Sequence, residues 1–139
     1  MTRRQAVATL AFQSHSQTQS SRRRFVGSWR LAQSQLIAGG RTVQHPYGKN
    51  AAGRLIYDAD GYMSAQIMAD EGAYGAFFGT YDIDEREAIV THTIEGSSQP
   101  RQAGTRQRRR FRFSSDTLTL EGDGPEGHTV TTWQRLRRR

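Results

Sequence analysis

Cysteine is absent from this chain of 139 residues, which excludes disulfide bonds and thiolate metal sites. Without disulfides, nothing favours an oxidising compartment, so a cytoplasmic location is expected. Long hydrophobic runs are also missing. No segment approaches the roughly 20 apolar residues of a membrane-spanning helix, so no membrane partner is predicted. The length suits a single domain with one hydrophobic core.

Acidic residues are missing from both ends of the chain, which together carry its excess positive charge. The net charge is +7, yet residues 1–24 hold five arginines and residues 135–139 hold four, with no acid in either segment. Residues 25–134 carry all 13 acids and a net charge of −2. A nucleic-acid-binding module would instead show a basic face on its folded body. Nucleic acid is therefore not a predicted partner.

The polar, serine- and glutamine-rich composition of residues 1–24 predicts a disordered basic tail. A targeting signal is the alternative, because Arg3 and Arg4 precede a short apolar stretch. That stretch is only about seven residues long, and no convincing small-residue cleavage site follows it. Residues 137–139 are predicted to form a basic C-terminal tail.

Several signatures of enzymes and cofactor sites do not occur. The four histidines lack metal-ligand spacing, and no glycine-rich loop leads into a helix to hold a phosphate. Ser64 has no nucleophile-elbow context. We therefore predict no metal and no cofactor.

What is present from Phe25 onward is an alternation of apolar and polar residues with period two. Turn-forming residues recur at short intervals, as in the segments 58–61 and 122–125, and no long amphipathic helix is indicated. Eight antiparallel strands are the number that closes a barrel around a small interior. The predicted fold is all-β, an eight-stranded antiparallel up-and-down β-barrel over residues 25–136. Its strands are expected near residues 26–36, 53–58, 62–68, 76–83, 88–95, 107–113, 117–121 and 128–136.

The two ends of this barrel are expected to differ. Trp29 on the first strand would plug the narrow end, with Arg135 or Arg137 over its indole face. Residues 37–52 are too long for a hairpin and are expected to arch over the mouth. Residues 96–105 are a second irregular segment, expected at the same rim. Trp133 is expected to be structural.

A set of short motifs resembles the lipocalin-like domain family of small bacterial and fungal proteins. They are Val26-Gly27-Ser28-Trp29-Arg30-Leu31, His45-Pro46-Tyr47-Gly48, Gly53-Arg54-Leu55-Ile56-Tyr57, Asp60-Gly61-Tyr62-Met63-Ser64-Ala65-Gln66, Phe78-Gly79-Thr80-Tyr81, Val90-Thr91-His92, Glu95-Gly96 and Gln107-x-Arg109. The resemblance covers about residues 25–136 and implies a lipocalin-like barrel with an internal ligand cavity. It implies little about chemistry, because members include binders, proteins of unknown role and proteins encoded within natural-product pathways. The chain departs from the pattern after Met68, where its insertion is shorter. The resemblance therefore does not determine the shape of the cavity mouth.

Alternation along the strands sorts the candidate site residues. It places His92 beside Val90 and Ile94 on an inward face, and Arg109 beside two phenylalanines. Such groups are costly inside unless paired or solvated. Either a structural polar network or the polar end of a ligand site would satisfy them. For residues 62–68, the alternation does not decide which set of alternate side chains faces inward. The candidate catalytic residues are His92, Arg109 and Tyr81, and the candidate ligand-binding residues are Gln33, Tyr57, Gln66, Phe77, Gln107 and Phe111.

The leading hypothesis is a cofactor-free isomerase or cyclase for a hydrophobic polyketide- or terpenoid-like molecule in specialised metabolite biosynthesis. The barrel would restrict the substrate's conformation, and His92 would shuttle a proton. Arg109, with Tyr81 or Gln107, would stabilise developing negative charge. The alternative is a non-catalytic binding or carrier protein for a hydrophobic small molecule. A monomer or homodimer is expected, and the sequence identifies neither the ligand nor the reaction.

Overall fold

The computed structural model describes residues 21–124 and 127–139. Within these ranges it contains nine strands, one short 3-10 helix and a helical turn at residues 21–25. The strands are β1 (Gly27–Ala38), β2 (Arg41–Gln44), β3 (Ala52–Tyr57), β4 (Tyr62–Met68), β5 (Tyr74–Asp84), β6 (Ile89–Ser97), β7 (Arg106–Ser114), β8 (Thr117–Gly124) and β9 (Gly127–Arg135), and the 3-10 helix η1 spans Pro100–Gln102. No helix in the described part of the chain is long and apolar enough to cross a membrane.

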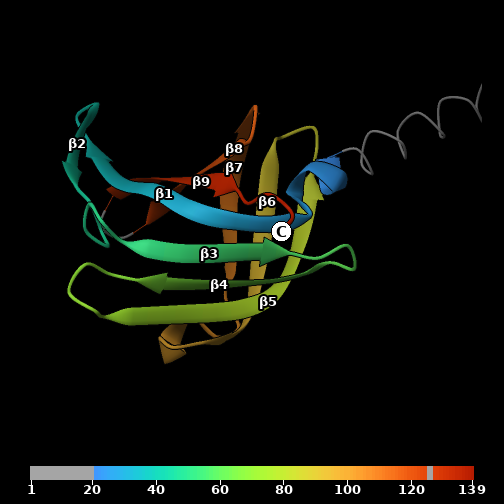
Figure 1. Cartoon of the computed structure of the whole chain (residues 1–139), viewed down its shortest axis with the longest axis horizontal. Helices are drawn as coiled ribbons and strands as arrows, with labels where there is room; N and C mark the ends of the chain where they lie inside the picture. Colours follow the sequence, from blue (N-terminus) through green and yellow to red (C-terminus); the bar gives the residue numbers. More distant parts are fainter. Residues whose placement is uncertain (1–20, 125–126) are drawn as a thin grey trace, which may run out of the picture.

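The strands form a closed antiparallel barrel (Figure 1). From β3 to β9 each strand pairs with its neighbour in sequence, β1 pairs with β3, and pairing of β1 with β9 closes the sheet. The eight strands β1 and β3–β9 make up the barrel, and β2 pairs only with the end of β1. The predicted eight-stranded up-and-down barrel is confirmed.

The short strand β2 lies inside the segment 37–52 that the sequence predicts as one long loop. β1 runs on to Ala38, and a turn at Gly39 and Gly40 leads directly into β2. Both glycines have positive φ, 59° and 74°, which suits the mirror-image turns of tight hairpins. The Gly-Gly pair is thus the local signal for this hairpin.

The loop between β2 and β3 is held in place from two sides. The His45 ring contacts the Ser34 carbonyl through Nδ1 at 3.0 Å. The Asp70 carboxylate accepts from the Asn50 backbone N–H at 2.9 Å, and the Asp70 N–H donates to the Tyr47 carbonyl at 3.1 Å. These contacts join the loop to β1 and to the β4–β5 turn.

At the opposite end, aromatic rings fill the barrel around Phe25, which is fully buried. Its ring lies 5.1 Å from that of Tyr57, 4.9 Å from that of Phe111 and 5.0 Å from that of Phe113. The Trp29 indole N–H donates to the Phe25 carbonyl at 2.9 Å. Because this packing anchors the preceding turn, residues 21–24 are helical, and the predicted end of the disordered tail at residue 24 is too late. Residues 1–20 lie outside the described ranges.

Arg135 completes the closed end. Its guanidinium carbon lies 4.1 Å from the Trp29 ring centroid, which confirms the predicted stacking for Arg135. The same guanidinium donates to the Val26 carbonyl at 3.0 Å and to the Arg24 carbonyl. A Cβ at Gly27 would lie only 3.0 Å from Arg135 Nη1, so a glycine leaves the space that this side chain needs.

Candidate functional site

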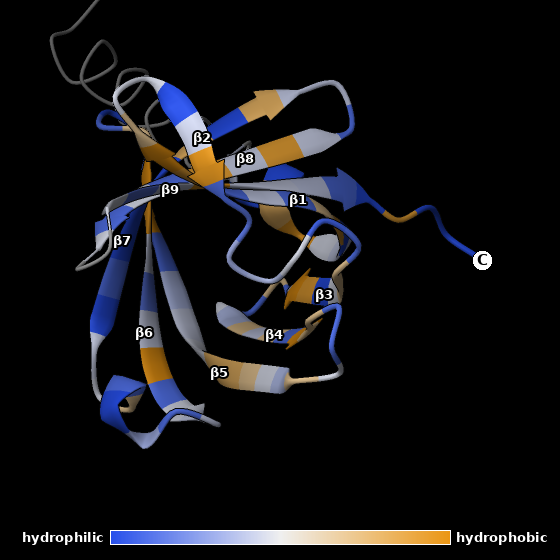
Figure 2. Cartoon of the chain, turned by 90° about the vertical axis from the view of Figure 1, so that its left-hand side faces the viewer, coloured by the Kyte–Doolittle hydropathy of each residue, from blue (hydrophilic) through white to orange (hydrophobic). Residues whose placement is uncertain are grey.

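A cavity of about 240 Å³ occupies the open half of the barrel. This exceeds the cavity of about 150 Å³ that takes up benzene in an engineered protein, so a molecule of roughly ten non-hydrogen atoms fits. Its apolar wall consists of Leu55, Ile67, Phe77, Leu120 and Trp133. Its polar wall consists of Ser34, His92, Gln107, Arg109, Thr129 and Thr131, and its rim includes Pro46, Tyr47, Ser97, Ser98, Gln99 and Gln102. Figure 2 looks toward this open side, where β2 and the 3-10 turn lie at the edge of the barrel. Both irregular segments contribute to the rim, as expected.

Four of the nine predicted site residues line the cavity: His92, Arg109, Phe77 and Gln107. They come from β5, β6 and β7, where the alternation is regular enough for parity to place them. Their roles toward a ligand stay predictions.

Two predicted ligand contacts face outward instead. Gln33 is exposed because the register of β1 shifts between Leu31 and Gln33, so that Ser34 and Leu36 are buried in its place. Gln66 is exposed because β4 buries its apolar alternates, including Ala65 and Ile67. Neither glutamine can contact a molecule in the cavity.

The remaining three predicted residues point inward but lie outside the cavity lining. The Tyr81 hydroxyl donates to the Asp58 carbonyl at 2.6 Å. Phe111 packs against Phe25 in the closed end. Tyr57 is buried beneath the cavity and reaches it only through His92. Parity therefore gave the correct side for these residues, but not their level along the barrel axis.

His92 is a buried, neutral side chain. Its Nε2 lies 2.7 Å from the Tyr57 hydroxyl oxygen. Burial, reinforced by the charge of Arg109, lowers the pKa of His92 to about 3. Burial, reinforced by Tyr81, raises the pKa of Tyr57 well above its usual value. The phenol thus keeps its proton, and the phenol and the neutral imidazole share this hydrogen bond. This low pKa works against a proton shuttle through His92 near neutral pH, and that role stays a prediction.

Arg109 brings a half-buried cation into the cavity wall. A Cβ at the facing Gly122 would lie 2.7 Å from Arg109 Cδ, so the glycine makes room for the side chain. The guanidinium donates to the Arg108 carbonyl at 2.9 Å and makes a long contact of 3.4 Å to Gln107 Oε1. Burial lowers the pKa of Arg109, and this effect is partly offset by Tyr47 and Tyr57, which raise it. The guanidinium nevertheless remains charged, as it does in proteins generally. Among the described residues, no carboxylate lies within ion-pair distance of it.

Sequence reasoning missed two aromatic residues of the site. Tyr47, 38% exposed at the rim, has its pKa raised by burial and lowered by the charge of Arg109. Trp133 was expected only to be structural, yet it lines the cavity, and within the described ranges its buried indole N–H has no hydrogen-bond partner. Trp133 could have been found from the inward parity it shares with Thr129 and Thr131. Tyr47 could not, because its position depends on contacts of its loop with Ser34 and Asp70.

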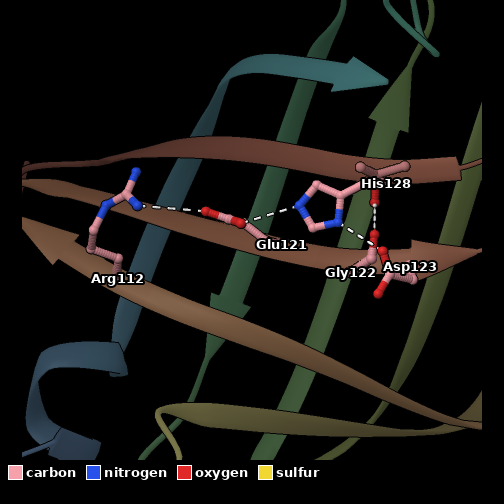
Figure 3. A network of polar contacts seen from close by, with 6 residues as sticks. Arg112, Glu121, Gly122, Asp123 and His128 are labelled. Atoms are coloured by element: carbon pink, nitrogen blue, oxygen red, sulfur yellow. Dashed lines mark hydrogen bonds and ion pairs between the residues drawn. The ribbon is translucent and has the colours of Figure 1, made fainter. Parts of the chain in front are cut away.

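The outer face of β7 has a different character. Arg106, Arg108, Arg110 and Arg112 are exposed on this face, and β7 is strongly hydrophilic in Figure 2. Arg112 pairs with Glu121 at 3.5 Å, and Glu121 also contacts the His128 ring at 3.2 Å (Figure 3). Hydrogen bonds to the carboxylates of Asp123 and Glu121 raise the pKa of His128. These charges are paired with one another or open to solvent.

The sequence pattern and this barrel agree with one family. A family model described as a lipocalin-like domain matches residues 26–76 and 70–136. The chain belongs to the lipocalin-like domain family. This confirms the resemblance seen in the motifs. No curated protein matches this lipocalin-like chain.

Solved structures show the same lipocalin-like barrel. A lipocalin-like protein from Bacteroides uniformis is 18% identical, with a TM-score of 0.56 over 81% of this chain and 99% of that one. A de novo designed fluorescence-activating β-barrel is 12% identical, with a TM-score of 0.50 over 84% of this chain and 97% of that one. At these identities the likeness shows the fold alone, so the function of this lipocalin-like chain must be argued from its own cavity.

Proposed function

We propose that the barrel binds a small, mainly apolar molecule in its interior. The observation that carries this proposal is the cavity of about 240 Å³, in which one wall of aliphatic and aromatic side chains is combined with converging polar groups. That composition is typical of small-molecule sites. Leu55, Ile67, Phe77 and Leu120 would contact the apolar body, and His92, Gln107 and Arg109 would orient its polar end.

A blocked cavity tests the proposal directly. Thr131 lines the cavity, whereas its neighbour Thr132 does not, so Thr131→Phe and Thr132→Phe add the same ring on opposite faces of β9. The probe is 2-naphthol, a neutral aromatic alcohol whose emission changes when it leaves water. We expect the parent to bind it, Thr131→Phe to weaken binding by at least about tenfold, and Thr132→Phe to change it by less than about twofold. Equal effects of the two variants, or no binding by the parent, would contradict an internal site.

Catalysis is a second proposal, favoured by the cation of Arg109 in the cavity wall. A cofactor-free isomerase or cyclase for a polyketide- or terpenoid-like molecule would here depend on conformational restriction and on Arg109 stabilising an enolate-like charge. His92 would take part as a neutral hydrogen-bonding group rather than as an acid. Isomer ratios measured by chromatography after incubation with polyene and polyketide substrates test this. We expect Arg109→Met to lose the turnover. In the parent, the rate plotted against pH should show no transition near pH 6.5, the ordinary pKa of histidine. A rate that follows a titration there would refute this form of the mechanism.

A further inference from the structure

We infer that the molecule held in the cavity is an anion, a small monocarboxylic acid whose carboxylate binds Arg109. This rests on the proposed binding function and adds the chemical class of the ligand. The argument depends on which charges and which hydrogen-bonding groups the cavity wall contains.

The charge balance of the cavity wall is positive. Within the described ranges its lining includes Arg109 and no aspartate or glutamate. His92 adds no charge near neutral pH, because burial holds its pKa at about 3. A half-buried guanidinium without a counter-charge is costly, and a bound anion would remove that cost. A neutral ligand would leave it, and a cationic ligand would increase it.

The groups that lack partners are hydrogen-bond donors. Arg109 uses only two of its N–H groups within the described ranges, on the Arg108 carbonyl and the Gln107 side chain. The Trp133 indole N–H has no acceptor there either. The raised pKa of Tyr47 keeps its hydroxyl protonated at neutral pH, so this rim residue can also donate. The ligand's polar end must therefore accept, and a carboxylate offers two charged acceptor oxygens.

The neighbouring arginines show that Arg109 is a special case on its own strand. Arg108 and Arg110 point outward and are exposed, where water satisfies them. Arg109 is the one that turns inward, into the space left by Gly122. The cavity volume suits a short aliphatic chain, or one or two fused aromatic rings, for the rest of the ligand.

Three probes of nearly equal shape test the inference: phenylacetate, phenylacetamide and phenethylamine. Isothermal calorimetry at neutral pH and low salt should show the parent binding phenylacetate at least about tenfold more tightly than phenylacetamide, and phenethylamine most weakly. Arg109→Met, which keeps an unbranched stem, should abolish the preference for the acid. Arg108→Met removes the same charge from the outer face of β7 and should preserve that preference.

A second variant covers the case in which Arg109→Met fails to fold. Gly122→Ala would place a Cβ 2.7 Å from Arg109 Cδ and so displace the guanidinium without changing the net charge. The acid preference should fall here as well. Glu126 is the one acidic residue that lies outside the described ranges. Glu126→Gln should leave the binding of phenylacetate unchanged.

The outcomes separate the two proposals. If 2-naphthol binds but the acid binds no better than the amide, the cavity is a binding site and the anion inference is wrong. A gain in acid affinity in Glu126→Gln would show that Arg109 already has an internal counter-ion, which also overturns the inference. If neither 2-naphthol nor any of the three probes binds, both the anion inference and the proposed binding function are wrong.

Discussion

At the closed end of the barrel the polar atoms of the large side chains have partners, whereas at the open end some do not. The Trp29 indole N–H reaches the Phe25 carbonyl, and Arg135 stacks on Trp29 while donating to backbone carbonyls. At the other end, Arg109 has no described counter-ion and the Trp133 indole N–H has no described acceptor. A tryptophan and an arginine thus have hydrogen-bond partners at the closed end, whereas a tryptophan and an arginine at the open end have donor groups without a described acceptor. Stability should therefore depend on the closed end, and binding on the open end.

The largest expected effect is on stability at the closed end. Trp29→Ala removes a fully buried ring that also holds Phe25 and Arg135, and should cost roughly 3–5 kcal/mol of unfolding free energy. Thr131→Ala, at the open end, should cost less than about 1 kcal/mol, since it removes few packed atoms from a cavity wall. Urea denaturation of the two variants measures both. Comparable losses would show that the two ends do not differ in this way.

The next effect is a pH dependence that originates between the two ends, at His92. Its pKa is about 3 in the folded chain against 6.5 in the unfolded chain, so below pH 6.5 the unfolded state binds the extra proton. The stabilisation from a neutral His92 is complete above pH 6.5 and is lost as the pH falls toward 3. By about pH 4 the loss should be about 3 kcal/mol, at up to about 1.4 kcal/mol for each pH unit. Denaturation midpoints at several pH values should show this slope in the parent and a flatter one in His92→Gln.

The sequence predicted regular strands well because their alternation is a local property. It placed Trp29, His92, Gln107 and Arg109 inside, since each lies in a stretch where its strand keeps register with a neighbouring strand. It failed at Gln33, because the shift in β1 inverts the parity of every later residue and no residue type marks its position.

Three other differences arise from information that alternation does not contain. The period-two pattern of β4 allowed Gln66 to face either way. It faces outward because β4 buries the apolar residues on its other face, including Ala65 and Ile67. Tyr81 and Phe111 face inward, but their height along the axis depends on strand tilt and stagger, which are properties of the whole barrel. Tyr47 reaches the rim through contacts between distant segments. The site was therefore predictable where it lies on regular strands, and not where loops and stagger place it.

A smaller effect is expected for the stacked arginine at the closed end. Arg135→Met should lower the unfolding free energy by about 2 kcal/mol, because it removes the cation over Trp29 and charge-assisted bonds to backbone carbonyls. Arg137→Met removes the same charge from an exposed position and should change stability by less than about 0.5 kcal/mol. Thermal unfolding at two salt concentrations distinguishes this local contact from a general effect of net charge. If both variants lost the same stability, the stacking would contribute nothing.

The smallest expected effects come from two glutamines that test the inside of the barrel against its outside. Gln107 lines the cavity, and its Oε1 lies 3.4 Å from Arg109 Nη2, so Gln107→Ala should loosen the guanidinium and weaken phenylacetate binding about two- to threefold. Gln66 is exposed on the outer face of β4, and Gln66→Ala should leave that affinity unchanged. Both variants remove one neutral amide from a strand, so their stabilities should differ little and calorimetry can compare their affinities directly. If Gln66→Ala weakened binding as much as Gln107→Ala, the acid would be held on the outer surface, and the open end of the cavity would lose its assigned role.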